Sequence, residues 1–270
     1  MSEATRPAAN LRVWGHAPFA AAVVHGGPGG AGEVAPVARQ LSAGRGILEP
    51  LQTAGSVEGQ LEELATLLRD SAGHGVPLIG HSWGAWLALM VAARYPGLVR
   101  NLILISSGVF DASLVPRMQA TRLNRLTAPE KLEYEGIERA LAEGEIISEE
   151  RFSRFSGLSD KADSYEAIDV AEPGDDPNLD GQPSIFESVW PEASEMRRSG
   201  RLLELIGQVT CPVVAIHGDS DPSPASGVEQ PLRAVLTDFR MIVLDRCGHT
   251  PWRERYARDP FFSILERELR

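Results

Sequence analysis

The sequence predicts an α/β protein with a mainly parallel central sheet covered by helices on both faces. Short apolar runs alternate with helical patterns through most of the chain, which is the order that a parallel sheet requires. Glycine-rich loops follow two of the apolar runs, at residues 25–30 and 80–84. Active sites in such sheets lie outside the carboxyl ends of the strands. We therefore expect a functional site at that edge of the sheet.

The overall composition narrows the class of partner. The chain has 270 residues, of which 43% are hydrophobic and 23% charged, as in ordinary globular proteins. The net charge of −11 argues against nucleic acid or an anionic membrane as a partner. Residues 1–7 lack the apolar core of a signal peptide, and no segment approaches the roughly 20 apolar residues of a membrane span. We expect a cytoplasmic protein.

The two cysteines are predicted to be free thiols. Cys211 opens one predicted strand and Cys247 follows the next, so they belong near opposite ends of the sheet. A strand of about five residues separates its ends by roughly 17 Å, beyond the ~7 Å within which two Cα atoms can be bridged. Two cysteines also make no zinc site. We expect no disulfide, no metal and no cofactor.

The first part of the chain alternates strands and helices. Strands are predicted at residues 11–14, 20–24, 46–51, 76–79 and 101–105, and helices at 33–41, at 56–68 and from the second glycine loop to residue 94. Ser56 is a natural N-cap for the second of these helices, because its hydroxyl can accept a free backbone N–H. The leucines of that helix recur at the spacing of a core-facing stripe.

The middle of the chain has a different character. From about residue 108 to 204 the strand signals fade, and helical segments alternate with loops such as 172–177. We interpret residues 108–204 as a helical cap inserted after the strand 101–105, over a core made of residues 1–107 and 205–270. Between residues 130 and 195 there are 19 acidic and 5 basic side chains. Most of these carboxylates belong on a solvated surface, and a minority facing the cleft would attract a cationic substrate group.

The sheet is predicted to resume after the cap. Strands are expected at residues 212–216 and 240–244, and a closing helix at 260–269. The loops at 217–222 and 245–252 follow the two strands and carry acidic and histidine residues. Both loops therefore belong at the same edge as the glycine loops.

The loop Gly80-His81-Ser82-Trp83-Gly84 is predicted to be a nucleophile elbow. A strand precedes it and a helix follows it, which is the context in which a serine hydroxyl is exposed above the sheet. The turn is so tight that only glycine fits two positions before and two after the serine. An ordinary turn between a strand and a helix is the alternative interpretation. A catalytic Ser82 requires a base, an acid and an oxyanion hole elsewhere in the chain.

The loop His25-Gly26-Gly27-Pro28-Gly29-Gly30 can supply part of the oxyanion hole. Missing side chains would let a backbone N–H point into the cleft and stabilise an anion. A glycine-rich surface turn is the alternative. We expect the oxyanion donors to be the N–H groups of Gly27 and Trp83, and we expect His25 to support the loop.

His249 is the predicted catalytic base, because it follows the last strand in a loop at the correct edge. His16 and His74 belong at the other end of the sheet. His25 and His81 are better explained as loop supports. The alternation of side chains along a strand does not decide whether the side chain of His217 points towards Asp221.

Asp221 is the predicted acid that orients the base. It precedes Pro222 in a turn that would direct the carboxylate towards the loop of His249. Asp219 in the same loop is the second choice, and Asp111 is a remote third. The chain order Ser82, Asp221, His249 is the order of the α/β-hydrolase arrangement.

These motifs together resemble the α/β-hydrolase superfamily over essentially the whole chain. The segments His25-Gly26-Gly27-Pro28-Gly29 and Ser82-Trp83-Gly84 are most similar to the proline iminopeptidase branch. The resemblance implies an α/β-hydrolase fold and, in that branch, a helical cap with glutamates that hold the free amino terminus of the substrate. An Asp-Gln-Arg-Gly-type loop of that branch is absent, since residues 47–53 read Ile-Leu-Glu-Pro-Leu-Gln-Thr.

The sequence therefore predicts a serine hydrolase that needs no cofactor. It would cleave an ester or amide bond of a small molecule or short peptide through an acyl-enzyme on Ser82. A small-molecule esterase or amidase and a proline iminopeptidase-type aminopeptidase both remain open, and a ligand-binding receptor on the same fold is the alternative from another class. Dehalogenase or epoxide-opening chemistry is disfavoured, because those branches use an aspartate at the position of Ser82. Three tryptophans, Trp86, Trp190 and Trp252, belong either to the pocket or to the core.

Overall fold

The computed structural model describes residues 9–168 and 182–270. The predicted loop 172–177 and the N-terminal residues 1–8 lie outside the described residues.

Within the described residues, seven strands form one sheet in the order β1-β3-β2-β4-β5-β6-β7. β1 pairs with β3 in the antiparallel sense, and all other neighbouring strands are parallel. The predicted mainly parallel sheet is confirmed. The strands are β1 (Leu11–Trp14), β2 (Phe19–Val24), β3 (Gly46–Pro50), β4 (Val76–His81), β5 (Val99–Ile105), β6 (Val213–Gly218) and β7 (Phe239–Leu244).

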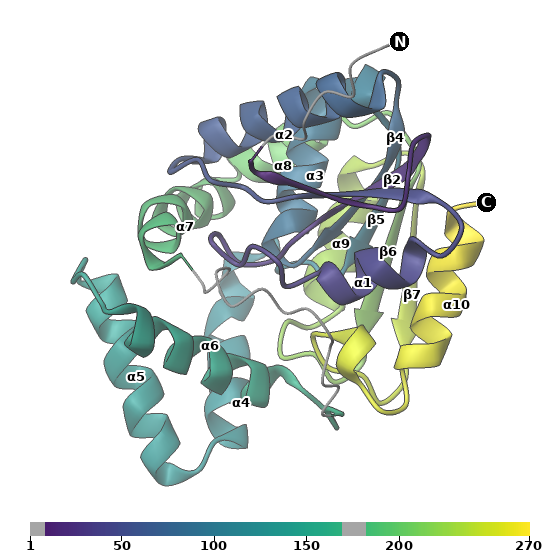
Figure 1. Ribbon diagram of the computed structural model, residues 1–270. Coiled ribbons are helices and arrows are strands. Elements are labelled where there is room, and N and C mark those ends of the chain that lie inside the picture. The colour runs from purple at the N-terminus through teal and green to yellow at the C-terminus, as the bar shows by residue number, and fades with distance from the viewer. Residues whose placement is uncertain (1–8, 169–181) are drawn as a thin grey trace.

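Helices cover both faces of this sheet (Figure 1). Successive strand residues point to opposite faces, and Leu78 and Ile79 of β4 accordingly belong to different apolar cores. The core that contains Ile79 is closed by α1 (Ala35–Leu41) and α10 (Arg258–Glu268). The core that contains Leu78 is closed by α2 (Val57–Ala72), α3 (Trp83–Arg94), α8 (Arg201–Ile206) and α9 (Ser226–Val235). The loops that end the strands are thereby held between two packed layers.

Most element boundaries agree with the predictions, and the differences have local causes. Ser56 caps α2 as predicted, since its Oγ accepts the N–H of Gly59 at 3.0 Å. Helix α1 begins at Ala35, two residues later than predicted, which frees Glu33 to contact other loops. Strand β6 continues to Gly218 and includes His217. The sequence did not predict α9, which contains Pro231, a residue that ordinarily breaks a helical pattern.

The chain between β5 and β6 is helical. It forms α4 (Val115–Arg125), α5 (Ala128–Ala142), α6 (Glu149–Asp163), α7 (Pro183–Arg198) and α8. Helices α4 to α6 stand apart from the sheet in Figure 1 and have small apolar clusters of their own, one of which is built around Tyr134 and Leu158. Helices α7 and α8 instead contribute side chains to the core that α2 and α3 share. The boundaries of the cap at residues 108 and 204 stay a prediction.

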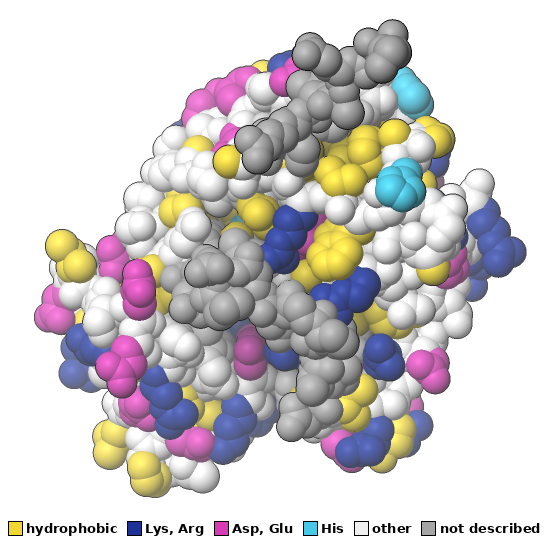
Figure 2. Space-filling view, in the orientation of Figure 1, with side chains coloured by type: hydrophobic (Ala, Val, Ile, Leu, Met, Phe, Trp, Pro, Cys, Tyr) yellow, Lys and Arg dark blue, Asp and Glu magenta, His cyan; other side chains and the backbone are white. Residues whose placement is uncertain are grey.

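The acidic surface of α5 and α6 is partly neutralised. In Figure 2, basic and acidic side chains lie next to one another over this part of the molecule. Arg154 forms two hydrogen bonds with Glu133, and Lys161 bonds both carboxylate oxygens of Glu130. These pairs are exposed, so each contributes little to stability. They fit the prediction that most carboxylates of this segment lie on a solvated surface.

Two further predictions concern thiols and membranes. Cys211 and Cys247 are free cysteines, as predicted. Among the helices in the described part of the chain, none is long and apolar enough to cross a bilayer.

Candidate active site

Ser82 lies on a strained turn between β4 and α3. Its backbone has φ +51° and ψ −112°, a conformation that non-glycine residues rarely adopt. A Cβ at Gly80 would lie 2.3 Å from the carbonyl oxygen of Gly84, and a Cβ at Gly84 would lie 2.4 Å from that of His25. Both glycines are therefore required by close backbone approach, as the elbow predicts. Ser82 is partly exposed, whereas its neighbours on both sides are buried.

His249 and Asp221 meet at the carboxyl ends of β7 and β6. The Nδ1 atom of His249 lies 2.8 Å from Oδ2 of Asp221. The other carboxylate oxygen, Oδ1, accepts the N–H of Ser223 at 2.8 Å. Asp221 is buried, and its carboxylate is fixed through both oxygens. This arrangement fixes the imidazole ring through Nδ1, so that Nε2 is the nitrogen that can act as the base.

The charges of this pair stabilise one another. Burial disfavours the imidazolium form of His249, but the charge and hydrogen bond of Asp221 outweigh it and raise the pKa of His249 to about 9. Burial likewise opposes the carboxylate form of Asp221, yet the charge and hydrogen bond of His249 and the N–H of Ser223 lower the pKa of Asp221 below its ordinary value. Asp221 therefore remains ionised beside the ring.

The two alternative acids have other partners. Oδ1 of Asp219 accepts the N–H of Cys247 at 3.1 Å, and so ties the loop after β6 to the loop after β7. Oδ1 of Asp111 accepts the N–H of Ser113 at 2.8 Å, at the start of a short 3₁₀ helix. Of the three candidates, Asp221 is the one hydrogen-bonded to His249.

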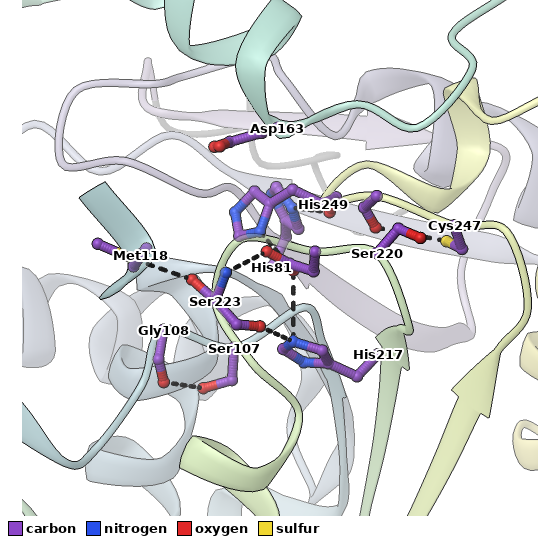
Figure 3. A network of polar contacts seen from close by, with 12 residues as sticks. His81, Ser107, Gly108, Met118, Asp163, His217, Ser220, Ser223, Cys247 and His249 are labelled. Carbon is purple, nitrogen blue, oxygen red and sulfur yellow. Dashed lines mark hydrogen bonds and ion pairs between the residues drawn. The ribbon is translucent and has the colours of Figure 1, made fainter. Parts of the chain in front are cut away.

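His217 also faces the carboxylate of Asp221, although strand parity left its direction open. Its Nε2 atom lies 3.4 Å from Oδ2 of Asp221 and 2.6 Å from the carbonyl oxygen of Ser223 (Figure 3). Burial lowers the pKa of His217, which favours the neutral ring. A proton on Nε2 can be donated to both oxygens. His217 thus supports the turn that carries the acid.

The glycine loop after β2 packs against the elbow. Gly27 has φ +39°, and a Cβ placed on Gly26 would lie 3.1 Å from Cβ of Ser82. Trp83 is the first residue of α3, so its N–H has no acceptor four residues earlier in the helix. The structure therefore places the loop of Gly27 and the N–H of Trp83 beside Ser82. Their role as oxyanion donors stays a prediction.

His25 supports the glycine loop from within the core. Its side chain is fully buried, and Nδ1 lies 2.7 Å from the carbonyl oxygen of Gly26. Nε2 accepts the N–H of Gln52 at 3.3 Å. Burial lowers the pKa of His25 and favours the neutral ring that these two contacts require. This geometry agrees with the supporting role that the sequence predicted.

Two of the three tryptophans belong to the core. Trp86 and Trp252 are 1% and 2% exposed, respectively. Trp190 of α7 is partly buried and stacks on Trp86, with ring centroids 6.1 Å apart.

Sequence reasoning missed three acidic residues that hold the loops of the site. The carbonyl oxygen of Asp163 accepts the N–H of His249 at 2.9 Å. The buried carboxylate of Glu254 accepts the N–H groups of Gly248, Tyr165 and Glu166 at 2.8 to 3.0 Å. These contacts join the end of α6 to the loop of His249. Glu33, the third, contacts Gly26 and His81. None of the three has a spacing motif that would have identified it.

The comparison with known proteins assigns the family. A model of the alpha/beta hydrolase family matches residues 12–259. The chain belongs to this family. By family it is a hydrolase, and the fold class predicted from the sequence is confirmed. No curated protein matches this sequence.

Solved structures share the fold at low sequence identity. VinJ is 19% identical with a TM-score of 0.68, over 96% of this chain and 93% of that one. A proline iminopeptidase from Mycobacterium smegmatis is 18% identical with a TM-score of 0.61, over 96% and 93% of the two chains. E-2-(acetamidomethylene)succinate hydrolase is 17% identical with a TM-score of 0.61, over 95% and 93%. At such identities the similarity establishes the fold alone.

The Asp221–His249 pair can be tested by its effect on titration. In the parent protein, NMR should show that the His249 ring loses its extra proton near pH 9. Asp221→Asn removes the main charge that favours the imidazolium, so the midpoint should move to lower pH. Asp219→Asn is the matched control in the same loop and should leave the midpoint in place. An unchanged midpoint in Asp221→Asn would contradict the pairing.

Proposed function

We propose that the protein is a serine hydrolase that cleaves an ester or amide bond of a small molecule or short peptide. The hydrogen bond between His249 and Asp221, 2.8 Å long, is the observation that carries the proposal. Ser82 adds the strained elbow next to this pair. It directly follows His81, whose ring centroid lies 4.9 Å from that of His249.

The residues divide the proposed reaction among them. Ser82 attacks the carbonyl carbon while His249 takes the hydroxyl proton, and Asp221 stabilises the imidazolium that results. The N–H groups of Gly27 and Trp83 stabilise the oxyanion. His249 then donates the proton to the leaving group, and the acyl group stays on Ser82. A water molecule, activated by the same histidine, releases the acid and restores the enzyme.

The raised pKa of His249 determines how the rate of the proposed reaction changes with pH. His249 accepts the serine proton only in its neutral form. Because Asp221 raises the pKa of His249 to about 9, the neutral fraction grows as the pH rises towards that value. The rate of the proposed acylation should therefore increase between pH 6 and pH 9.

A fluorophosphonate probe tests the nucleophile directly. The parent protein should be labelled, faster at pH 9 than at pH 6, and Ser82→Ala should lose at least about 99% of the labelling because the attacking oxygen is gone. Ser263→Ala, in helix α10, is the control and should label like the parent. A folded parent that does not label would reject the serine hydrolase and favour a ligand-binding receptor.

The exposed carboxylate of Asp160 favours an aminopeptidase as a second candidate. Its environment raises the pKa of Asp160 to about 6, first through loss of hydration and then through the negative charge of Glu33, although 62% of its side chain is exposed. Asp160 also forms an ion pair with Arg253, with 3.9 Å between the nearest nitrogen and oxygen atoms. An ammonium group bound here would share the carboxylate with Arg253 and offset the negative charge of Glu33. Such a group is the free amino terminus of a peptide substrate.

A pair of chromogenic substrates separates the two candidates. If the protein is an aminopeptidase, prolyl-p-nitroanilide should be cleaved, and Asp160→Asn should raise its KM about tenfold by removing a charge that binds the ammonium group. The same variant should leave the KM for a neutral p-nitrophenyl ester within about twofold. Rapid ester cleavage with no cleavage of the anilide would reject the aminopeptidase.

A further inference from the structure

Glu33 and His81 form a contact beside Ser82 that the proposed reaction does not use. Oε1 of Glu33 lies 3.2 Å from Nδ1 of His81, and the His81 side chain is 1% exposed. His81 ends β4 and directly precedes the nucleophile. Glu33 lies between the glycine loop and helix α1. The contact therefore connects the turn that carries Ser82 to the segment that follows the glycine loop.

Both ring nitrogens of His81 face oxygen acceptors. Nε2 lies 3.1 Å from the carbonyl oxygen of His249, and Nδ1 faces the Glu33 carboxylate. The carbonyl contact requires a proton on Nε2. Nδ1 is buried and has the carboxylate of Glu33 as its neighbour. His81 thus lies between Glu33 and the loop of His249 and contacts both.

Glu33 holds the glycine loop with its other carboxylate oxygen. Oε2 accepts the N–H of Gly26 at 3.0 Å, one residue before the predicted oxyanion donor Gly27. A Cβ at Gly26 would lie 2.7 Å from this oxygen and 2.7 Å from Nδ1 of His81, so the contact needs glycine here. Burial opposes the charged form of Glu33, but the charge and hydrogen bond of His81 lower the pKa of Glu33 to about 2.

The pair also completes the support of His249. The peptide N–H of His249 is bound by Asp163, its carbonyl oxygen by His81, and its ring by Asp221. The ring of His81 is itself held by Trp252, whose ring lies edge-on at 4.8 Å. Fixing the base from three sides restricts the movement of its ring relative to Ser82.

We propose that Glu33 and His81 are positioning residues that set the oxyanion loop and the loop of the catalytic base at their correct places around Ser82. Glu33 binds the first loop through Gly26, and His81 binds the second through the carbonyl oxygen of His249. Neither residue takes part in proton transfer to or from the substrate. This inference rests on the proposed function, because it assigns the pair to the same reaction.

The rate constant of fluorophosphonate labelling measures this positioning. Glu33→Ala removes the contacts to Gly26 and His81 and should slow labelling at least about tenfold, since small displacements of reacting groups are costly. Glu33→Gln should label within about threefold of the parent. Its amide oxygen can accept the Gly26 N–H, and its NH₂ group can donate to Nδ1 of a neutral His81. Thermal unfolding of each variant establishes that it is folded.

Glu229→Ala is the matched control. Glu229 also forms an ion pair, with Arg233, and its side chain is 35% exposed like that of Glu33, but it lies on α9. This variant should label within about twofold of the parent. Parent-like labelling of Glu33→Ala would overturn the proposal. Equal loss in folded Glu33→Ala and Glu33→Gln would overturn it as well, because charge and not position would then be responsible.

A second measurement does not depend on activity. In the Ser82→Ala background, a crystal structure should show one oxygen of Glu33 close to Nδ1 of His81 and the other within hydrogen-bond distance of the N–H of Gly26. A Glu33 side chain turned away from His81 and Gly26 would contradict the pair. If the parent fails to label, the proposed function falls while this experiment still decides whether the pair exists.

Discussion

The close approach of the elbow to the end of β2 is the constraint on which the site depends. Ser82 is held at φ +51°, a strain of the order of 1–3 kcal/mol that the surrounding structure must offset. The burial of α3 offsets this strain, because its residues from Trp83 to Ala92 are buried between the sheet and its neighbouring helices. Gly84 lets this helix begin against the carbonyl oxygen of His25. The same contact brings the glycine loop to the side of Ser82.

The loops of the site are held by buried charges with several partners each. A buried carboxylate is costly unless hydrogen bonds compensate it. Asp221 is contacted by Ser223, His217 and His249, and Glu254 receives three backbone N–H groups. The contacts of Glu254 and of the Asp163 carbonyl connect α6 to the loop of His249. The position of the base is therefore coupled to the helices between β5 and β6.

The sequence predicts the parts of this site that depend on local rules. The positions of Ser82, Asp221 and His249 follow from loops at strand ends in a parallel sheet, and the glycines of the elbow follow from the space that a tight turn leaves. The roles of Glu33 and Glu254 depend on contacts with segments distant in sequence, which no spacing reveals. The sequence did not predict where the His217 side chain points, because β6 continues past the end that the apolar residues of this strand suggested.

The central claim is that Ser82 forms an acyl-enzyme with the help of His249 and Asp221. Mass spectrometry of the intact protein, quenched within milliseconds of mixing with p-nitrophenyl acetate, measures this intermediate. One added acetyl group is expected, located on Ser82 by peptide mapping and absent from Ser82→Ala. Release of p-nitrophenol without an adduct on Ser82, or with the acetyl group on another residue, would contradict it.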